Sequence, residues 1–376
     1  MEIHVVQSGE TMEGIAETYN SSYEELLQYN QLPNPDNLVV GQCVLIPSAS
    51  APLGEMIVNG YLYPHIDEEV YRQALPSLTN VTIFGYGFDA EGNLIETPDE
   101  EVIAIAKSYG VQPIMLLAAM DEQGQFSLEN GRIVFNNTLL QEKLIAGILV
   151  VMQQKGYVGL DIDMEFIPAD LKEAYINFIE NVTRQLNQYG YFVNVDLAPK
   201  VSATQQGLLY ESHDYARIGQ IVDRVLLMTY EWGYTYGPPM AVAPLPSVKR
   251  VLDYGVTEIA REKIFMGIPN YGYDWPLPYE RGVTAARTIG NEEAIMLAVN
   301  YRTEILFDEN AMSPYFYYTD EQGIQHVVWF EDARSIQAKI QLGFSYPLRG
   351  LGYWNIMRPF PQNWRVVDAL CEVEKM

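Results

Sequence analysis

The chain has 376 residues, of which 48% are hydrophobic and 19% charged, and its formal net charge is −26. This length accommodates a large domain plus a small module, and the apolar share allows a large core. The negative charge argues against nucleic acid or an anionic membrane as a partner.

The chain begins without a basic segment followed by an apolar one, and it contains no long apolar run. We therefore expect neither a signal peptide nor a membrane helix. The two cysteines, Cys43 and Cys371, lie at opposite ends and form no disulfide framework, which fits synthesis in a reducing compartment. The four histidines are scattered without ligand spacing, so we expect no metal site and no cofactor.

The first 48 residues have the pattern of a small module. Thr11 and Ser22 stand where N-caps would satisfy the first backbone N–H groups of two short helices. The expected elements are a strand at 3–6, helices at 11–19 and 22–29, and a strand at 44–47. We predict a βααβ module over 1–48 and a linker at 49–55, because the latter is rich in small residues, proline and glycine.

This module resembles a LysM domain over its whole length. The residues that carry the resemblance are Val5–Thr11, Ile15–Ala16, Asn30, Leu38–Gln42 and Val44–Pro47. LysM domains bind glycans that contain N-acetylglucosamine, such as peptidoglycan and chitin, so the resemblance implies a glycan partner. The alternative is a βααβ unit that only folds.

Eight apolar, β-rich runs follow the linker, and segments with helical periodicity separate most of them. The runs cover 56–63, 81–87, 112–118, 156–163, 191–198, 223–230, 264–270 and 349–354, and the helical segments include 138–154, 169–188 and 363–374. Eight alternations of strand and helix predict an α/β fold, a (β/α)8 TIM barrel, over residues 56–376. The gap before the eighth run is too long for one helix. We interpret its residues, about 283–330, as an α+β insertion that walls one side of a cleft.

The fourth run carries acids on one face. As a strand, it places Asp161, Asp163 and Glu165 on one side and only aliphatic side chains on the other. In a barrel the aliphatic face packs under helices, and the acids point into the barrel towards the strand ends where chemistry occurs. Three carboxylates in a partly dry interior cannot all ionise easily, so Glu165, nearest the mouth, is a candidate general acid. The alternatives are a solvent-facing edge strand or a calcium site.

Gly159, Asp161, Asp163 and Glu165 resemble the signature Asp-Gly-x-Asp-x-Asp-x-Glu of glycoside hydrolase family 18, with Val158 in place of the first Asp. The resemblance implies that Glu165 protonates the glycosidic oxygen and that Asp163 orients the substrate's own N-acetyl group as the nucleophile. It also implies that Asp161 tunes Asp163. By strand parity Val158 faces the helix layer, so its presence should alter tuning without removing the acid/base.

Other strand ends supply candidate contacts to the substrate. Met228-Thr229-Tyr230 matches the family's Met-x-Tyr, which implies that the Tyr230 hydroxyl supports the reacting acetamido carbonyl. Trp354 matches the family's tryptophan floor under the sugar, and its alternative is a buried aromatic at the barrel bottom. The further candidates for substrate binding are Asn270, Tyr271, Trp275, Glu231, Trp232 and Tyr61.

Segments 228–233, 237–244 and 328–333 resemble LysM-bearing bacterial spore hydrolases that trim cortex peptidoglycan during germination. We therefore expect a retaining β-N-acetylglucosaminidase that acts on peptidoglycan strands, above all spore cortex. Its expected location is the spore coat, the cortex or the cell wall, with the LysM module tethering it to the substrate. A chitinase or chito-oligosaccharide hydrolase and a catalytically silent glycan-binding protein are the alternatives. The sequence leaves open the oligomeric state and the choice between exo and endo cleavage.

Overall fold

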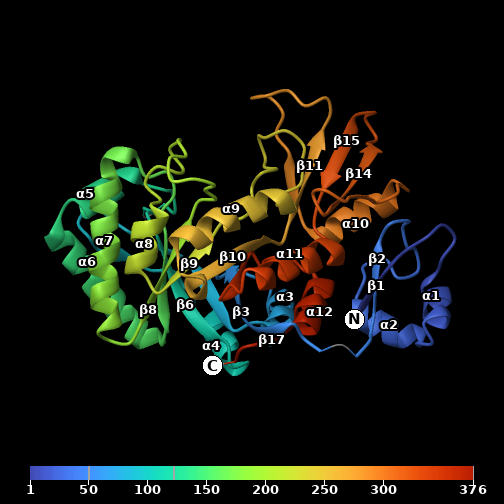
Figure 1. Ribbon diagram of the computed structural model, residues 1–376, viewed down its shortest axis with the longest axis horizontal. Coiled ribbons are helices and arrows are strands. Elements are labelled where there is room, and N and C mark those ends of the chain that lie inside the picture. The colour runs from blue at the N-terminus through green and yellow to red at the C-terminus, as the bar shows by residue number, and fades with distance from the viewer. Residues whose placement is uncertain (50, 122, 376) are drawn as a thin grey trace.

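The computed structural model describes residues 1–49, 51–121 and 123–375. Position 50 of the predicted linker and position 376, the end of the predicted barrel domain, lie outside the described residues. Figure 1 shows a small N-terminal unit in blue beside an orange-to-red insertion, with the barrel occupying the rest of the molecule.

The N-terminal unit has the predicted βααβ order, and its two strands pair antiparallel. Thr11 Oγ1 accepts a hydrogen bond from Gly14 N at 3.2 Å, and Ser22 Oγ accepts one from Glu25 N at 3.0 Å. Both predicted N-caps are therefore formed. The elements are β1 (Glu2–Val5), α1 (Met12–Thr18), α2 (Tyr23–Asn30) and β2 (Cys43–Ile46).

Eight parallel strands form the closed barrel that the sequence predicts. Each pairs with the next, and the last pairs with the first, which closes the sheet. Their side chains are buried almost throughout, because helices cover one face and the barrel interior covers the other. The strands are β3 (Gly54–Leu62), β4 (Asn80–Phe88), β6 (Gln112–Ala118), β7 (Gly159–Asp163), β8 (Phe192–Leu197), β9 (Arg224–Leu227), β10 (Ile264–Pro269) and β16 (Gly350–Trp354).

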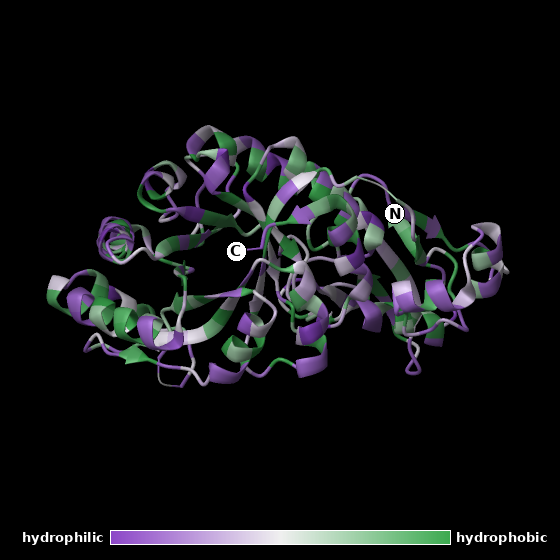
Figure 2. Ribbon diagram, turned by 90° about the horizontal axis from the view of Figure 1, so that it is seen from below, coloured by the Kyte–Doolittle hydropathy of each residue, from purple (hydrophilic) through white to green (hydrophobic). Residues whose placement is uncertain are grey.

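Helices surround the barrel, and Figure 2 shows both apolar and polar residues on them, as expected when one side of each helix packs on the strands. They are α3 (Glu68–Ala74), α4 (Glu100–Ser108), α5 (Leu128–Phe135), α6 (Thr138–Lys155), α7 (Lys172–Asn187), α8 (Tyr215–Ile221), α9 (Leu245–Glu258), α11 (Ala333–Ser345) and α12 (Pro361–Leu370). Short 3-10 turns are η1 (Leu75–Ser77), η2 (Ala169–Leu171) and η3 (Arg261–Lys263). A short strand, β5 (Leu94–Ile95), pairs with β4.

Two element boundaries differ from the prediction. Gly156 ends α6 with a left-handed φ of 70°, so β7 begins only at Gly159 and Glu165 lies beyond its last residue. The predicted helix at 363–374 ends at Leu370, and β17 (Cys371–Val373) pairs with the start of β3. This pairing with β3 overrides the helical periodicity of the last residues.

The predicted α+β insertion lies between β10 and β16. Its antiparallel sheet has the order β12-β11-β15-β14-β13 and starts earlier than residue 283, because Gly272 already belongs to it. The elements are β11 (Gly272–Pro276), β12 (Arg287–Ile289), α10 (Asn291–Asn300), β13 (Leu306–Asp308), β14 (Ser313–Thr319) and β15 (Gln325–Trp329).

Within the described ranges no single helix is long and apolar enough to cross a membrane. The pair α5 and α6, bent by 108°, meets the criteria of length and composition when the two are taken together.

Candidate active site

A row of acids leads out of the barrel along β7. Asp161 is 0% exposed and Asp163 is 6% exposed, and strand alternation places both on one side of β7, as predicted. Glu165 follows two residues later, half-buried in the loop after the strand. The row therefore rises from the barrel interior to its mouth.

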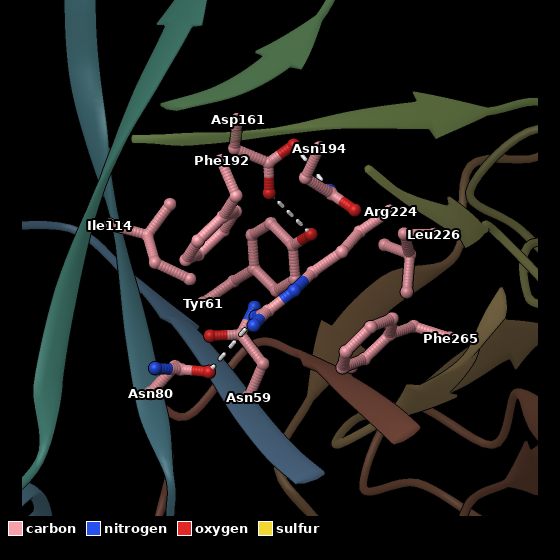
Figure 3. A pocket seen from close by; sticks show the side chains of 11 residues that line it. Asn59, Tyr61, Asn80, Ile114, Asp161, Phe192, Asn194, Arg224, Leu226 and Phe265 are labelled. Carbon is pink, nitrogen blue, oxygen red and sulfur yellow. Dashed lines mark hydrogen bonds between the residues drawn. The ribbon is translucent and has the colours of Figure 1, made fainter. Parts of the chain in front are cut away.

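Asp161 shares a hydrogen-bond network with a carboxylate on the neighbouring strand. The Tyr61 hydroxyl donates to Asp161 Oδ2 at 2.7 Å and lies 2.9 Å from Asp196 Oδ1. Asn194 Nδ2 donates to Asp161 Oδ1 at 2.6 Å and lies 3.1 Å from Asp196 Oδ1. Figure 3 shows Tyr61 and Asn194 pointing at the Asp161 carboxylate, each at a different oxygen.

Sequence reasoning missed Asn194 and Asp196, although a signal was present. Polar Asn194 and Asp196 alternate with apolar residues on β8, as the acids do on β7. Parallel pairing of β7 with β8 sets Asp161 opposite Asn194. The same alternation rule would have placed both side chains inside the barrel.

The buried acids hold their protons tightly. Burial raises the pKa of Asp161 to about 6, although hydrogen bonds from Asn194 and Tyr61 oppose the rise. Burial raises the pKa of Asp163 well above its usual range, and the charges of Glu165 and Asp161 add to this. Burial, followed by the charges of Asp161 and Asp163, does the same for the pKa of Asp196. These carboxyl groups therefore cannot all be ionised at the same time, and the ionisation of one raises the pKa values of the others.

Asp163 has an unused hydrogen-bonding atom. Its Oδ1 is buried and has no hydrogen-bond partner among the described residues. A buried polar atom without a partner costs free energy, so it signals a function or a missing ligand. An N–H group entering from the cleft would satisfy this oxygen.

Tyr230 stands close to the acids as a neutral hydroxyl. It is buried, three residues after the end of β9. Burial raises its pKa well above the usual range, and the charges of Asp196 and Asp163 raise the pKa further. Tyr230 therefore keeps its proton and can donate a hydrogen bond to an acceptor oxygen in the cleft.

Glu231 lies beside Glu165 and is held by two tyrosines. The Tyr271 hydroxyl donates to Glu231, and the Tyr273 hydroxyl lies 3.0 Å from Glu231 Oε1. Burial raises the pKa of Glu231, and the hydrogen bonds from both tyrosines oppose the rise. Burial, and then the charge of Glu231, raise the pKa of Glu165. Glu231 thus helps to keep Glu165 protonated at higher pH.

Replacing Glu231 by Gln is therefore expected to shift the pH profile. Without that charge the pKa of Glu165 falls, so Glu165 loses its proton at a lower pH. The alkaline limb of kcat/KM should move to lower pH, which a pH series on a soluble substrate measures. Glu372→Gln in β17, an exposed position at the other end of the barrel, is the control and should leave the limb in place. If the alkaline limb of the pH profile stayed in place in Glu231→Gln, the charge of Glu231 would not affect the pKa of Glu165.

Trp354 ends β16 and forms part of an aromatic cluster. Its ring centroid lies 6.0 Å from Tyr61, 6.2 Å from Tyr63 and 5.9 Å from Phe84, each with edge geometry. Trp354 is half-buried, so part of its ring remains accessible at the strand end. It can therefore offer a stacking surface to a sugar ring. No sequence pattern singled out Phe84.

Three residues that were predicted to contact the substrate are buried and hydrogen-bond to other protein groups. Trp275 is 0% exposed, and its Nε1 donates to the Gly237 carbonyl at 2.9 Å. Asn270 is 2% exposed, and its Nδ2 donates to the carbonyls of Asn355 and Arg358. These expectations are corrected because the chain turns from β10 into the sheet of the insertion, which buries both side chains.

The third is Tyr61, which is almost fully buried below the acids. Its hydroxyl is committed to Asp161 and Asp196, so it supports carboxylates and does not face the cleft. Tyr271 is also buried, and its hydroxyl donates to Glu231.

Two grooves meet at Glu165. One, of about 470 Å³, is lined by Tyr230, Glu231 and Trp232 among others. The second, of about 720 Å³, is mostly apolar and includes Phe126 and Phe166. A chain-like substrate can therefore extend past Glu165. In the part of the chain that the structure describes, no three His, Cys, Asp or Glu side chains are arranged to hold a metal.

Known proteins share both parts of this chain. The model of glycosyl hydrolases family 18 matches residues 119–358, and the LysM domain model matches residues 4–47. The chain is 35% identical to the cortical fragment-lytic enzyme of Bacillus subtilis (strain 168), over 100% of this chain and 99% of that protein.

Solved structures of other proteins superpose on this fold. The spore cortex-lytic enzyme SleL of Bacillus megaterium QM B1551 superposes with a TM-score of 0.93 at 33% identity, covering 100% of this chain and 99% of that one. A chitinase from Chromobacterium violaceum ATCC 12472 superposes with a TM-score of 0.76 at 22% identity, covering 84% and 98%, and shares the fold.

Proposed function

Because this chain belongs to glycosyl hydrolase family 18, we propose that it is a retaining β-N-acetylglucosaminidase that cleaves peptidoglycan strands, with spore cortex as its substrate during germination. The likeness to cortex-lytic proteins over the full chain supports this substrate. The spore cortex and coat, or the cell wall, are the matching locations.

The observation that carries the reaction type is the unpartnered Oδ1 of Asp163. In the proposed mechanism this oxygen accepts the N–H of the substrate's acetamido group and turns its carbonyl oxygen towards the anomeric carbon. The Tyr230 hydroxyl donates to the acetamido group and fixes its orientation. The contact with Asp163 tightens as positive charge develops on the acetamido group, so it favours the transition state over the ground state.

Glu165 supplies the proton. As the acetamido oxygen attacks the anomeric carbon, the glycosidic bond breaks and Glu165 protonates the departing oxygen. The resulting oxazolinium ion is positive, and Asp163 stabilises it by accepting the hydrogen bond from the acetamido N–H. Glu165, now ionised, takes a proton from water, and the water oxygen attacks the anomeric carbon. Two displacements at one carbon retain its configuration.

A second candidate is a chitinase or chito-oligosaccharide hydrolase. The acids that line the cleft favour an uncharged polymer. Chitin consists of N-acetylglucosamine alone and therefore fits the same acetamido chemistry.

Product analysis separates the candidates. Wild type and Glu165→Gln are incubated with purified cortex, vegetative sacculi and chitin oligomers, and the products are examined by mass spectrometry. We expect wild type alone to release fragments with N-acetylglucosamine at the new reducing end, and to do so from cortex. Release from chitin oligomers alone would favour the chitinase. Binding without any cleavage would indicate a glycan-binding protein.

A further inference from the structure

The N-terminal LysM unit is built into the enzyme and is not a freely tethered module. On the side of α12, Gln362 Nε2 donates to Asn30 Oδ1 at 2.8 Å and to the Cys43 carbonyl at 3.0 Å, and all three residues are buried. Arg365 Nε donates to the Tyr29 carbonyl at 3.2 Å, and its guanidinium lies 5.2 Å from the centroid of the Tyr29 ring. These contacts replace the flexible attachment that the sequence suggested.

The insertion and the start of α11 hold the other side of the unit. Ile305 N donates to the Val40 carbonyl at 2.9 Å, and Arg334 Nη2 donates to the Gly41 carbonyl at 3.0 Å. Gly41 has a φ of 84°, and a Cβ there would lie 1.8 Å from the Ile305 carbonyl oxygen. Only glycine fits this contact. The unit is therefore fixed to both α12 and the insertion.

The loop between α2 and β2 is stiffened from within. Asn34 and Gln42 exchange amide hydrogen bonds of 2.9 Å and 3.0 Å, and Gln42 Oε1 also accepts from Val39 N at 3.1 Å. Both amide side chains are buried. Residues 37–40 therefore form a rigid rim.

This rim borders two grooves. On one side, the loops 9–13 and 35–38 of the LysM unit line an open groove of about 740 Å³. On the other side, 37–40 and residues 299–304 of the insertion line an open groove of about 620 Å³. Asn37 and Leu38 line both grooves, so the grooves adjoin. Figure 1 shows α10, which leads into 299–304, next to the N-terminal unit.

The charges around the rim are uneven. Residues 1–48 contain no Lys or Arg, and their acidic residues are Glu2, Glu10, Glu13, Glu17, Glu24, Glu25 and Asp36. The insertion adds Arg302 to the second groove, where it is exposed, and the structure shows no ion pair for it among the described residues. Glu304 lines the same groove. Arg302 is thus the cation that the acidic unit lacks.

We propose that the groove between 37–40 and 299–304 is a second glycan-binding site, in which Arg302 pairs with a carboxylate of an anionic N-acetylhexosamine strand. The inference rests on the proposed function, because the peptides attached to peptidoglycan strands carry such carboxylates and chitin does not. A strand lying along the LysM loops continues over the rim into this groove. Since the unit is docked, the strand is held in a fixed direction relative to the barrel.

Binding of the full-length chain to purified sacculi tests the site, with Glu165→Gln in every variant to prevent digestion. Arg302→Glu should weaken binding about threefold to tenfold at low salt, and added salt should reduce the difference. Glu304→Lys should strengthen binding, and Arg302→Lys should stay near the parent. Arg261→Glu in η3, an exposed arginine at the opposite end of the barrel, is the matched control and should bind like the parent.

Chitin beads provide the uncharged comparison. The Arg302→Glu difference should be absent on chitin, because no carboxylate is present. Equal binding of Arg302→Glu, Glu304→Lys and the parent to sacculi would overturn the inference, as would an equal loss on sacculi and chitin. Hydrolysis by the chain without Glu165→Gln is measured separately. If no hydrolysis were detected while the charge effects on binding were observed, the proposed function would be wrong and the proposed binding site would be supported.

Discussion

Replacing Glu165 by Gln is expected to lower kcat/KM for glycan hydrolysis by about 10²–10⁴-fold. The amide has nearly the same shape but cannot protonate the departing oxygen. Burial and the neighbouring Glu231 raise the pKa of Glu165, so the wild-type residue carries its proton to higher pH than an exposed glutamate would. The loss should fall on kcat, because substrate contacts are unchanged.

Steady-state kinetics on a soluble oligosaccharide measure this effect. Glu180→Gln, on the exposed face of α7, is the matched control and should keep full activity. Thermal unfolding of Glu165→Gln should resemble that of wild type, which excludes misfolding. Activity of Glu165→Gln within a few-fold of wild type would remove Glu165 from the role of acid.

Replacing Asp163 by Asn is expected to cost about 10²–10³-fold in kcat while making the protein more stable at neutral pH. The introduced amide can present its N–H₂ group where an oxygen must accept the acetamido N–H, so the hydrogen bond that stabilises the oxazolinium ion is lost. The same change removes a buried carboxyl group whose Oδ1 has no partner among the described residues. Function and stability should therefore move in opposite directions.

The pKa of Asp163 gives the pH dependence of the stability gain. Its pKa is raised in the folded protein above the ordinary value of 3.8, so the unfolded chain releases this proton first as pH rises. Below pH 3.8 the Asp163 carboxyl group is protonated in both states and costs the fold nothing. As pH rises from 3.8 towards the folded pKa, ionisation of the unfolded chain lowers the stability of the folded state. Asp163→Asn avoids this loss. Its Tm should exceed that of wild type by about 2–4 °C at pH 7, and the difference should shrink towards pH 4.

Calorimetry across this pH range checks the stability, and single-turnover kinetics check the activity. Asp170→Asn is a contrasting control, because the hydrogen bond from Arg132 lowers the pKa of exposed Asp170. The Asp170→Asn substitution should leave kcat unchanged and should not raise Tm. A lower Tm for Asp163→Asn at pH 7 would mean that the Asp163 carboxylate stabilises the fold.

Much of the barrel could be predicted because its signals are local. All eight strands lie within the predicted runs or extend them by a residue or two, since alternating or continuous apolar residues report strand burial directly. The side-chain alternation of β7 placed Asp161 and Asp163 on one face for the same reason. The prediction was wrong where a contact with a distant segment sets the secondary structure. Cys371–Val373, for example, form a strand because they pair with β3.

Sequence alone predicts the order of strands and helices, the βααβ unit and the acids that enter the barrel, because strand and helix periodicity depend only on nearby residues. The folded arrangement was needed to show that Trp275 and Asn270 are buried, and that Tyr61 and Asp196 share a network with Asp161. It was also needed to show that the LysM unit is docked against the insertion and α11. These features depend on contacts between residues far apart in the chain, and no local pattern records which distant partner a side chain will meet.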